Sequence, residues 1–386
     1  MFNDCTSLTT APALPATTLE SSCYRNMFQG CTGLKTAPAL PATSLVNNCY
    51  YEMFRGCSSL SSVTCLATSG ININHSTENW LYGVDAPGTF TKNASTPTGS
   101  GTNGQYWPTS SANGIPDGWT TIIPVVPGKF SVSSTKKVYF APGNLQYQAS
   151  TSTWQFAAHQ YDNIGADNRY ISSSYSGWID LFGWGTSGYA HGAPCYQPWS
   201  SSMTNTDYRP YNSLTANLYD GNGRADWGYN AISNGGNTEN CGWRTPKKDE
   251  WVYLFNSRTT PSGIRYAKAT VSGVTGIILL PDDWSTTYYS LSNTNVSNAA
   301  WLSNTISASD WTNNLEKHGA VFLPTSGNRD GANAPSSGFV SCWSSDYYAG
   351  NSKDAYVVYI PGDSVYPGAL GQRSTGNPVR LVQDAN

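Results

Sequence analysis

The residues that could do chemistry are scattered along the chain and do not form a known catalytic motif. The histidines share no metal-ligand spacing, and there is no Cys-x-x-Cys pair of the kind that binds zinc. No Gly-x-Ser-x-Gly elbow marks a nucleophilic serine, although a Ser-His-Asp triad built from distant segments stays open. Residues 99–104 match Gly-x-Gly-x-x-Gly, but they follow no predicted strand and open no predicted helix, so we do not interpret them as a nucleotide-binding loop. The histidines are His75, His159, His191 and His318.

One segment is rich in oxygen atoms that could bind calcium. It reads Asp220-Gly221-Asn222-Gly223-Arg224-Ala225-Asp226. Calcium needs several oxygen ligands, but the spacing is not that of an EF-hand and Arg224 stands where a ligand would. We predict a turn held by hydrogen bonds between side chains and backbone, with calcium as the alternative and no other cofactor.

Composition excludes some classes of function. Only 12% of the 386 residues are charged, the net charge is −3, and no basic run could neutralise nucleic-acid phosphates. The polar surface must come from Ser, Thr, Asn, Gly and Tyr, which is typical of a β-rich protein with long loops. The 14 Trp and 25 Tyr supply apolar area that disordered chains lack, so we expect a folded protein of two or three domains.

No targeting or spanning segment is visible. There is no run of about 18 apolar residues that would predict a transmembrane helix. There is also no charged start followed by an apolar run, so no export signal is predicted. Met1-Phe2-Asn3-Asp4-Cys5 falls in the middle of a repeat, and we therefore expect this chain to be a piece of a longer protein.

Internal repeats dominate the first part of the chain. Met1-Phe2-Asn3-Asp4-Cys5-Thr6-Ser7-Leu8 recurs from Met27 and again from Met53, an offset of 26 residues each time. Ala11-Pro12-Ala13-Leu14-Pro15-Ala16 likewise recurs from Ala37. Such a period predicts a solenoid whose turns bury their faces against one another. The pattern resembles the BspA-type leucine-rich repeats of bacterial surface proteins over residues 1–69, and we interpret its recurring cysteines as small buried residues rather than metal ligands or disulfides.

Three further segments follow the repeats. Residues 70–123 are rich in Asn, Ser, Thr and Gly with Trp80, Trp107 and Trp119 as anchors, and we predict a loop-rich cap. Residues 124–129 contain two prolines and are predicted to be a semi-rigid linker. Eleven of the 14 Trp lie beyond them, which favours a separate domain over residues 130–386.

Elements within this domain can be predicted from pattern. Residues 130–132 and 138–140 form an expected hairpin, and residues 276–280 a buried strand. Residues 245–255 predict a helix with Thr245 as cap and Pro246 at its first position. Four more strands are expected at residues 320–323, 339–343, 355–360 and 378–382.

Five strings in the domain carry a second resemblance. They are Gly242-Trp243-Arg244-Thr245-Pro246 with Glu250-Trp251, Leu280-Pro281-Asp282-Asp283-Trp284, Gly319-Ala320-Val321-Phe322-Leu323-Pro324, Trp343-Ser344-Ser345, and Arg373 with Gly376, Val379, Arg380, Leu381 and Val382. Together they resemble surface domains of gut and rumen bacteria, which are similar to the formylglycine-generating-enzyme branch of the C-type lectin fold. The resemblance covers residues 130–386 and includes variable proteins of diversity-generating retroelements.

The resemblance implies a fold and a function. The expected fold is an α+β C-type-lectin-like domain with a small antiparallel sheet and long loops, attached to the short leucine-rich-type solenoid. Its first and last strands, here 130–132 and 378–382, are expected to pair. Variable proteins of this kind change residues near the C-terminus to bind different ligands, and their variable stretch ends close to a motif present here at Gly376–Arg380.

The predicted contact surface lies in this C-terminal region. Strand alternation puts Phe339, Ser341 and Trp343 on one face and Val340 and Cys342 on the other, without saying which face is wet. Tyrosine and asparagine are typical of adaptable binding surfaces because tyrosine offers large contact area at low entropy cost. The predicted ligand-binding residues are Asn328, Asp330, Phe339, Ser341, Cys342, Asp346, Tyr347, Tyr348, Asn351, Ser374, Thr375 and Asn377.

Three functions remain in order of preference. The first is an adhesin on the surface of a bacterium or phage that binds a protein or glycan of another cell, with no catalysis, nucleic acid or membrane span. The second is an oxidase of the formylglycine type, which would pair Cys342 with another cysteine in a cleft; Trp343-Ser344-Ser345 follows the non-enzymatic pattern. The third is a structural tip of a pilus or tail fibre.

Overall fold

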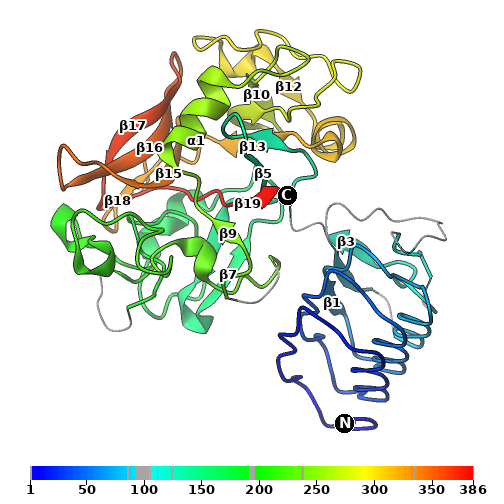
Figure 1. Cartoon of the computed structure of the whole chain (residues 1–386). Coiled ribbons are helices and arrows are strands. Elements are labelled where there is room, and N and C mark those ends of the chain that lie inside the picture. Colours follow the sequence, from blue (N-terminus) through cyan, green and yellow to red (C-terminus); the bar gives the residue numbers. More distant parts are fainter. Residues whose placement is uncertain are drawn as a thin grey trace. The chain divides into compact units, whose positions relative to one another are not determined.

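The chain folds into two compact units. A computed structural model describes residues 2–84, 87–92, 104, 106–110, 112–122, 125–190, 196–235, 239–333 and 335–385. Unit 1 is Met1–Pro124 and unit 2 is Val125–Asn386, and each is described by itself (Figure 1). Most of the Gly-x-Gly-x-x-Gly match at 99–104, together with His191 and Cys195, lies outside the described residues.

Unit 1 stacks its repeats through backbone hydrogen bonds. The N–H of Phe2 donates to Met27 and that of Phe28 to Met53, both at 2.9 Å. The N–H of Phe54 donates to Trp80 in the same way, so the stacking continues into the segment predicted as a cap. A parallel sheet of β1 (Ser62–Cys65), β2 (Thr89–Lys92) and β3 (Thr120–Ile122) runs along the stack.

Aromatic columns and buried thiols fill the interior of unit 1. Phe2, Phe28 and Phe54 stack with ring centroids 5.5 and 5.6 Å apart. The thiols of Cys31 and Cys57 donate to the carbonyls of Phe2 and Phe28 in the preceding turn. Burial raises the pKa of Cys57 to about 12. The described cysteines form no disulfide, and the prediction of buried cysteines is confirmed for the inner turns, whereas Cys5 and Cys23 are exposed.

Unit 2 consists mostly of short strands and loops. Four of its sheets have the orders β4-β5-β19-β9, β7-β6-β8, β12-β10-β11-β13 and β15-β16-β17, and β14 pairs with β18. The strands are β4 (Phe130–Ser131), β5 (Lys137–Phe140), β6 (Leu145–Gln148), β7 (Thr153–Phe156), β8 (Trp178–Ile179), β9 (Trp243–Arg244), β10 (Tyr266–Val271), β11 (Val274–Leu279), β12 (Thr305–Ile306), β13 (Val321–Pro324), β14 (Arg329–Asp330), β15 (Val340–Tyr347), β16 (Asp354–Ile360), β17 (Tyr366–Gln372), β18 (Thr375–Gly376) and β19 (Val382–Ala385). These strands confirm the predicted hairpin and four of the five other predicted strands; the lectin-like class itself stays a prediction.

Helices are short. Among the described residues they are α1 (Lys248–Val252), α2 (Ala308–Asp310), and short segments of 3-10 or π-helix at Ala149–Thr151, Gly165–Tyr170, Asn205–Asp207, Pro210–Asn212, Trp227–Tyr229, Tyr253–Ser257, Trp301–Ser303, Trp311–Leu315 and Glu316–His318. The helix predicted from residue 245 begins later, with Lys247 as its N-cap. Thr245 is not the cap because its N–H and hydroxyl both donate to the carboxylate of Asp226.

The two ends of unit 2 meet in one sheet, but not as predicted. Residues 130–132 do not pair with residues 378–382, because β5 lies between β4 and β19 and the last strand begins at Val382. Pro378 and Val379 instead accept hydrogen bonds from Trp343 and Leu145, one on each side of the chain. A continuous ladder is therefore replaced by single bonds to two different segments.

The predicted linker belongs to the packed core of unit 2. Val126 is buried, and its N–H donates to the carbonyl of Phe140 at 2.6 Å. A side chain on Gly128 would lie 2.6 Å from the carbonyl oxygen of Gly319, so only glycine allows this approach. Residues 125–129 therefore do not act as a free spacer.

Asp282 joins the opening hairpin to the segment after β11. Its carboxylate accepts the N–H and hydroxyl of Ser131 and pairs with Lys137 at 2.9 Å and Arg258 at 3.2 Å. Burial alone would raise the pKa of Asp282, but the hydrogen bonds from Ser131 and the two cations outweigh it and the pKa is lowered.

A lowered pKa predicts how Asp282 affects acid stability. The folded state holds its proton less tightly than the unfolded chain, so the stabilisation is present above pH about 4 and is lost as the pH falls through the folded pKa. We expect Asp282→Asn to lower the free energy of unfolding at neutral pH and to converge with wild type in acid, measured by urea unfolding across pH. The exposed neighbour provides the control: Asp283→Asn should follow the wild-type profile, and a constant offset for Asp282→Asn at every pH would contradict the prediction.

Candidate ligand-binding site

Strand β15, which carries several predicted contact residues, is covered on both faces. Val340 and Cys342 belong to one hydrophobic core. Trp343 is buried on the other face, where its indole N–H donates to the carbonyl of Phe182 at 2.6 Å. The alternation of side chains left open which face of this strand contacts solvent. In the structure, both faces of residues 340–343 are buried.

Four predicted ligand-binding residues are buried, which corrects the prediction. Ser341, Cys342, Ser374 and Asn377 are 4%, 1%, 7% and 2% exposed. The hydroxyl of Ser341 donates to the side-chain oxygen of Asn377 at 2.6 Å, and Asn377 exchanges backbone hydrogen bonds with Phe182. The hydroxyl of Ser374 donates to the side chain of Asn205. These polar side chains hold the frame together and do not face a ligand.

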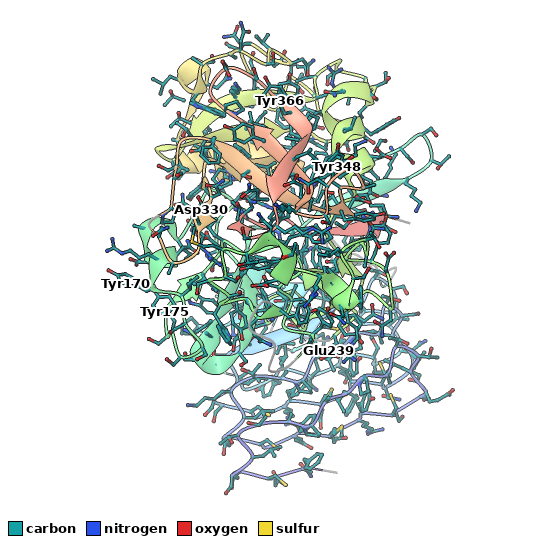
Figure 2. All side chains as sticks on the ribbon, turned by 90° about the vertical axis from the view of Figure 1, so that its left-hand side faces the viewer. Tyr170, Tyr175, Glu239, Asp330, Tyr348 and Tyr366 are labelled. Carbon is teal, nitrogen blue, oxygen red and sulfur yellow. The ribbon has the colours of Figure 1, made fainter. Side chains whose placement is uncertain are left out.

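The other eight predicted residues reach the surface but do not form one site. Asp330 and Asn351 are exposed, and the remaining six are half-buried. Thr375 donates to Asp330 where β18 pairs with β14, and Asn328 pairs with Ser336 next to them. Asn351 lies in the turn between β15 and β16. Figure 2 labels Tyr366, the first residue of β17, and Tyr348, which follows β15, apart from Asp330, which lies in the separate β14-β18 pair.

Phe339 begins an aromatic strip across this sheet. Its ring meets that of Tyr359 edge to face at 5.4 Å, and Tyr359 stacks with Tyr366 at 6.4 Å. Tyr359 and Tyr366 are 37% and 51% exposed. They form a cross-strand pair, since Tyr359 is the register partner of Tyr366.

A groove of about 820 Å³ opens beside the predicted residues Asp346 and Tyr347. Its walls come from six stretches of the chain, between residues 132 and 384. The lining residues are Val132, Ser133, Lys136, Asn217, Tyr219, Arg244, Lys247, Lys248, Asp249, Glu250, Asp346, Tyr347, Tyr356 and Asp384. The volume falls in the range of small-molecule sites, which is about 300–1,000 Å³.

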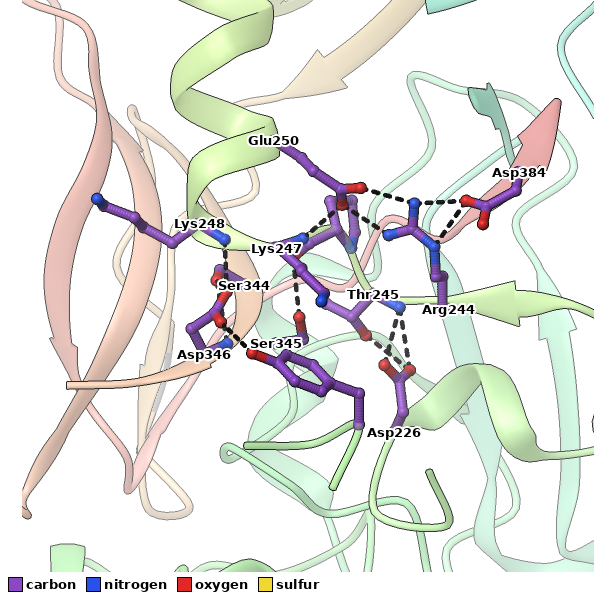
Figure 3. A network of polar contacts seen from close by, with 12 residues as sticks. Asp226, Arg244, Thr245, Lys247, Lys248, Glu250, Ser344, Ser345, Asp346 and Asp384 are labelled. Atoms are coloured by element: carbon purple, nitrogen blue, oxygen red, sulfur yellow. Dashed lines mark hydrogen bonds and ion pairs between the residues drawn. The ribbon is translucent and has the colours of Figure 1, made fainter. Parts of the chain in front are cut away.

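Asp346 joins three walls of the groove (Figure 3). Its carboxylate accepts the N–H of Lys248 at 2.6 Å, at the start of α1, and the hydroxyl of Tyr219 at 2.9 Å. It also accepts the hydroxyl of Ser344 at 3.2 Å. Burial and the Asp346 charge raise the pKa of Tyr219, so its proton stays in this hydrogen bond. Asp346, which the sequence predicts as a contact residue, is a positioning residue here.

A second cluster fixes the opposite wall (Figure 3). Arg244 makes two parallel bonds to Glu250, at 2.6 and 2.7 Å, and a bond of 2.6 Å to Asp384. Burial alone would lower the pKa of Arg244, but Glu250 and Asp384 outweigh it and the pKa is raised. Glu250 also accepts the N–H of Lys247, which ties the cluster to the start of α1.

Tyrosine and lysine side chains remain at the surface of these walls. The ammonium of Lys247 lies 4.1 Å from the ring centre of Tyr219. The ammonium of Lys248 lies 5.5 Å from the ring centre of Tyr356, which meets Tyr348 edge to face. The sequence reasoning missed Tyr219, Lys247, Lys248 and Tyr356; the Lys247-Lys248 doublet and the tyrosines of residues 355–360 were visible signals.

The residues with catalytic chemistry are spread apart. Cys342 is buried and burial raises its pKa to about 12. His75 contacts Glu78, while His159 and His318 stack on Tyr161 and Tyr288. In the described part of the chain, no three side chains of His, Cys, Asp or Glu gather as metal ligands. Calcium was the alternative prediction for residues 220–226. In this segment the carboxylate of Asp226 accepts hydrogen bonds from the N–H groups of Gly228 and Thr245, and the carboxylate of Asp220 accepts one from the N–H of Asn217.

Comparisons with family models, curated proteins and solved structures found no match to this chain. The two resemblances therefore rest on the motifs alone. Among the described residues, no helix has the length and apolar character needed to cross a lipid bilayer.

Proposed function

We propose that this chain is an extracellular binding protein of a bacterial or phage surface, and that unit 2 binds a protein or glycan ligand of another cell. The observation that carries the proposal is the groove at Asp346 and Tyr347, where tyrosines stand on walls that hydrogen bonds already fix. A fixed frame with outward tyrosines reduces the entropy lost on binding.

Frame and contact residues are separate in this groove. Asp346, Arg244 and Glu250 satisfy one another or the backbone, so their charges are used inside the protein. The side chains of Tyr347 and Tyr356 are half-exposed. Each comes directly after a residue of the frame, Asp346 or the buried Ala355. Their identity can change with little effect on folding, which suits a surface that varies between related proteins.

A diversified surface is part of the proposal. The positions suited to variation are the outward ones in residues 346–366, namely Tyr347, Tyr348, Asn351, Tyr356, Tyr359 and Tyr366. Buried positions such as Ser341 and Asn377 are unsuited to it. A reverse-transcriptase gene and a near-copy of the 3′ coding end, differing at adenines, would support diversification; without such a copy, only general adhesion would remain.

The runner-up oxidase has less support. It needs an accessible thiolate, whereas the thiol of Cys342 is 1% exposed and its raised pKa favours the neutral form. The binding function is for this reason the one we put forward.

Two groove tyrosines test the proposed function. With the labelled full chain on a glycan array and on whole bacterial cells, we expect Tyr347→Ala or Tyr356→Ala to weaken binding about 30-fold, because removing an anchor costs about 2 kcal/mol. The control, Tyr170→Ala, removes a tyrosine that is 50% exposed outside the groove and should bind as wild type. Unchanged binding by both groove variants, or no binding by the wild-type chain to any probe, would overturn the proposal.

A further inference from the structure

Unit 2 has a second, smaller pocket that shares no described lining residue with the groove. Its volume is about 240 Å³, which is below the range of about 300–1,000 Å³ for drug-sized ligands and suits a single small ring. We call it the Trp154 pocket. The residues that matter for its chemistry are Tyr147, Trp154, Gln197, Pro198, Asn230 and Glu239.

One wall of the Trp154 pocket is a fixed pair of strands. Tyr147 in β6 and Trp154 in β7 are register partners, and the centres of their rings lie 4.5 Å apart. The carbonyl of Trp154 also accepts the N–H of Ser233 at 2.8 Å. The two rings are therefore in place before a ligand arrives, which reduces the entropy lost on binding.

Polar atoms of this wall lack partners inside the protein. Tyr147 and Trp154 are each 6% exposed, yet within the described part of the chain the Trp154 indole N–H and the Tyr147 hydroxyl form no hydrogen bond. Neither atom is sealed from solvent, so both open into the pocket that they line. A donor in a side chain that is more than nine-tenths buried indicates a ligand that can accept a hydrogen bond there.

Hydrogen-bond acceptors line the same pocket. The side-chain NH2 groups of Asn230 and Gln197 donate to backbone carbonyls at 3.1 Å, which fixes both amides and leaves their oxygens to accept. The carboxylate of Glu239 forms no ion pair with a described residue. No Lys or Arg is among the described lining residues. The pocket thus combines free acceptors, a free donor and aromatic rings without a cation.

We infer that the Trp154 pocket binds one uncharged sugar ring, such as the terminal hexose of a glycan. A sugar hydroxyl both donates and accepts, so one ligand can serve the Trp154 N–H and the oxygens of Asn230 and Glu239. The C–H face of the ring packs on the ring atoms of Tyr147 and Pro198. This site is additional to the groove, and the inference does not depend on ligand binding there.

Other small ligands leave part of the pocket unsatisfied. A phosphate or carboxylate would face the Glu239 carboxylate without a cation to offset the repulsion. An ammonium group only donates, so the Trp154 N–H would stay without an acceptor. An apolar ring would bury the amide oxygens and the carboxylate without donors.

A panel of small ligands tests the inference on the full chain by calorimetric titration. The probes are the methyl glycosides of glucose, galactose and mannose, with methyl glucuronide as the acidic counterpart and cyclohexylammonium as a ring that carries only a cation. We expect at least one neutral glycoside to bind with a dissociation constant of about 1 mM. It should bind at least about tenfold more tightly than either charged probe.

The indole N–H signal of Trp154 in a nuclear magnetic resonance spectrum locates the binding. The signal that disappears in Trp154→Phe identifies it, and in wild type it should shift when the glycoside is added. Trp154→Phe keeps an aromatic ring but removes the donor, so it should weaken binding about fivefold. The control is Trp178→Phe, a half-buried tryptophan of β8 outside the pocket, which should bind as wild type.

Glu239→Gln gives an independent readout, because Glu239 is exposed and its replacement tests the pocket even if Trp154→Phe does not fold. We expect it to weaken the neutral glycoside about tenfold and to reduce the discrimination against methyl glucuronide. The exposed Asp167 lies outside the pocket, and Asp167→Asn should leave both affinities unchanged.

The contrary results are distinct. If no glycoside at about 50 mM shifted the Trp154 signal, the pocket would be a solvent-filled recess only and the inference would be wrong. Tighter binding of cyclohexylammonium than of every glycoside, lost in Glu239→Gln, would make it a cation site instead. Neither result bears on the groove: Tyr347→Ala, which tests the proposed function, should leave the shift of the Trp154 signal unchanged.

Discussion

Replacing Arg380 with methionine is expected to lower the free energy of unfolding by about 3–5 kcal/mol. The guanidinium of Arg380 is fully buried and reaches the carbonyls of Ala141 and Phe322 at 3.1 and 2.8 Å. It also bonds the side chains of Asn144 and Gln160. Burial lowers the pKa of Arg380 to about 10, so it stays charged at neutral pH. Methionine fills similar space but leaves these acceptors without their donors.

Denaturant unfolding, followed by near-ultraviolet circular dichroism, measures this effect. The control is Arg224→Met, because Arg224 is exposed, and it should change stability by less than about 0.5 kcal/mol. A loss under about 1 kcal/mol for Arg380→Met would show that neighbouring donors or water replace the guanidinium, contrary to the prediction.

Replacing Trp80 with alanine should cost unit 1 about 3–5 kcal/mol of stability. The Trp80 ring is fully buried and lies between Tyr50 and Trp107, at 6.2 and 5.3 Å. Its indole N–H donates to the carbonyl of Gly114 at 2.9 Å. Alanine opens a cavity in the middle of the column and leaves that carbonyl without its donor.

Thermal and denaturant unfolding of the full chain check the Trp80 prediction. The matched variant is Tyr82→Ala, two residues away and 52% exposed, which should change stability by about 0.5 kcal/mol or less. If the two variants lost the same amount, the stacked column would not be the source of stability that its geometry indicates.

Regular patterns in the sequence predicted regular parts of the structure. The offset of 26 residues anticipated which turns of unit 1 bond to each other, such as Phe2 to Met27. The run at Gly276–Leu280 predicted β11, because a buried strand of an inner sheet is a continuous apolar run. Such predictions succeed where one local signal decides the structure.

Failures arose where distant segments decide it. Thr245 looks like a helix cap, but the carboxylate of Asp226 takes its donors and moves the start of α1. Strand β17 was missed because its Pro and Gly residues argue against a strand, and it survives at the edge of its sheet.

The contact surface shows the same limit. Ser341 in β15 was predicted as a contact residue, but its hydroxyl donates to the side chain of Asn377 inside the domain. The groove forms where residues near 133, 219, 247 and 346 come together in the fold. Their spacing in the sequence does not predict this contact. Asp346 and Tyr347 were found because tyrosine-rich turns near the C-terminus fit the resemblance.

The thiol-to-carbonyl bonds of unit 1 have a practical consequence. Cys5 is exposed to reagents. Cys31 and Cys57 occupy the same position in the next two turns, where they are buried and their thiols donate to carbonyls of the preceding turn. A turn must part from its neighbour before its sulfur can be alkylated, so the order of labelling reports local opening along the stack without any introduced probe. The native cysteines can therefore be used to measure how readily each repeat of unit 1 separates from its neighbour.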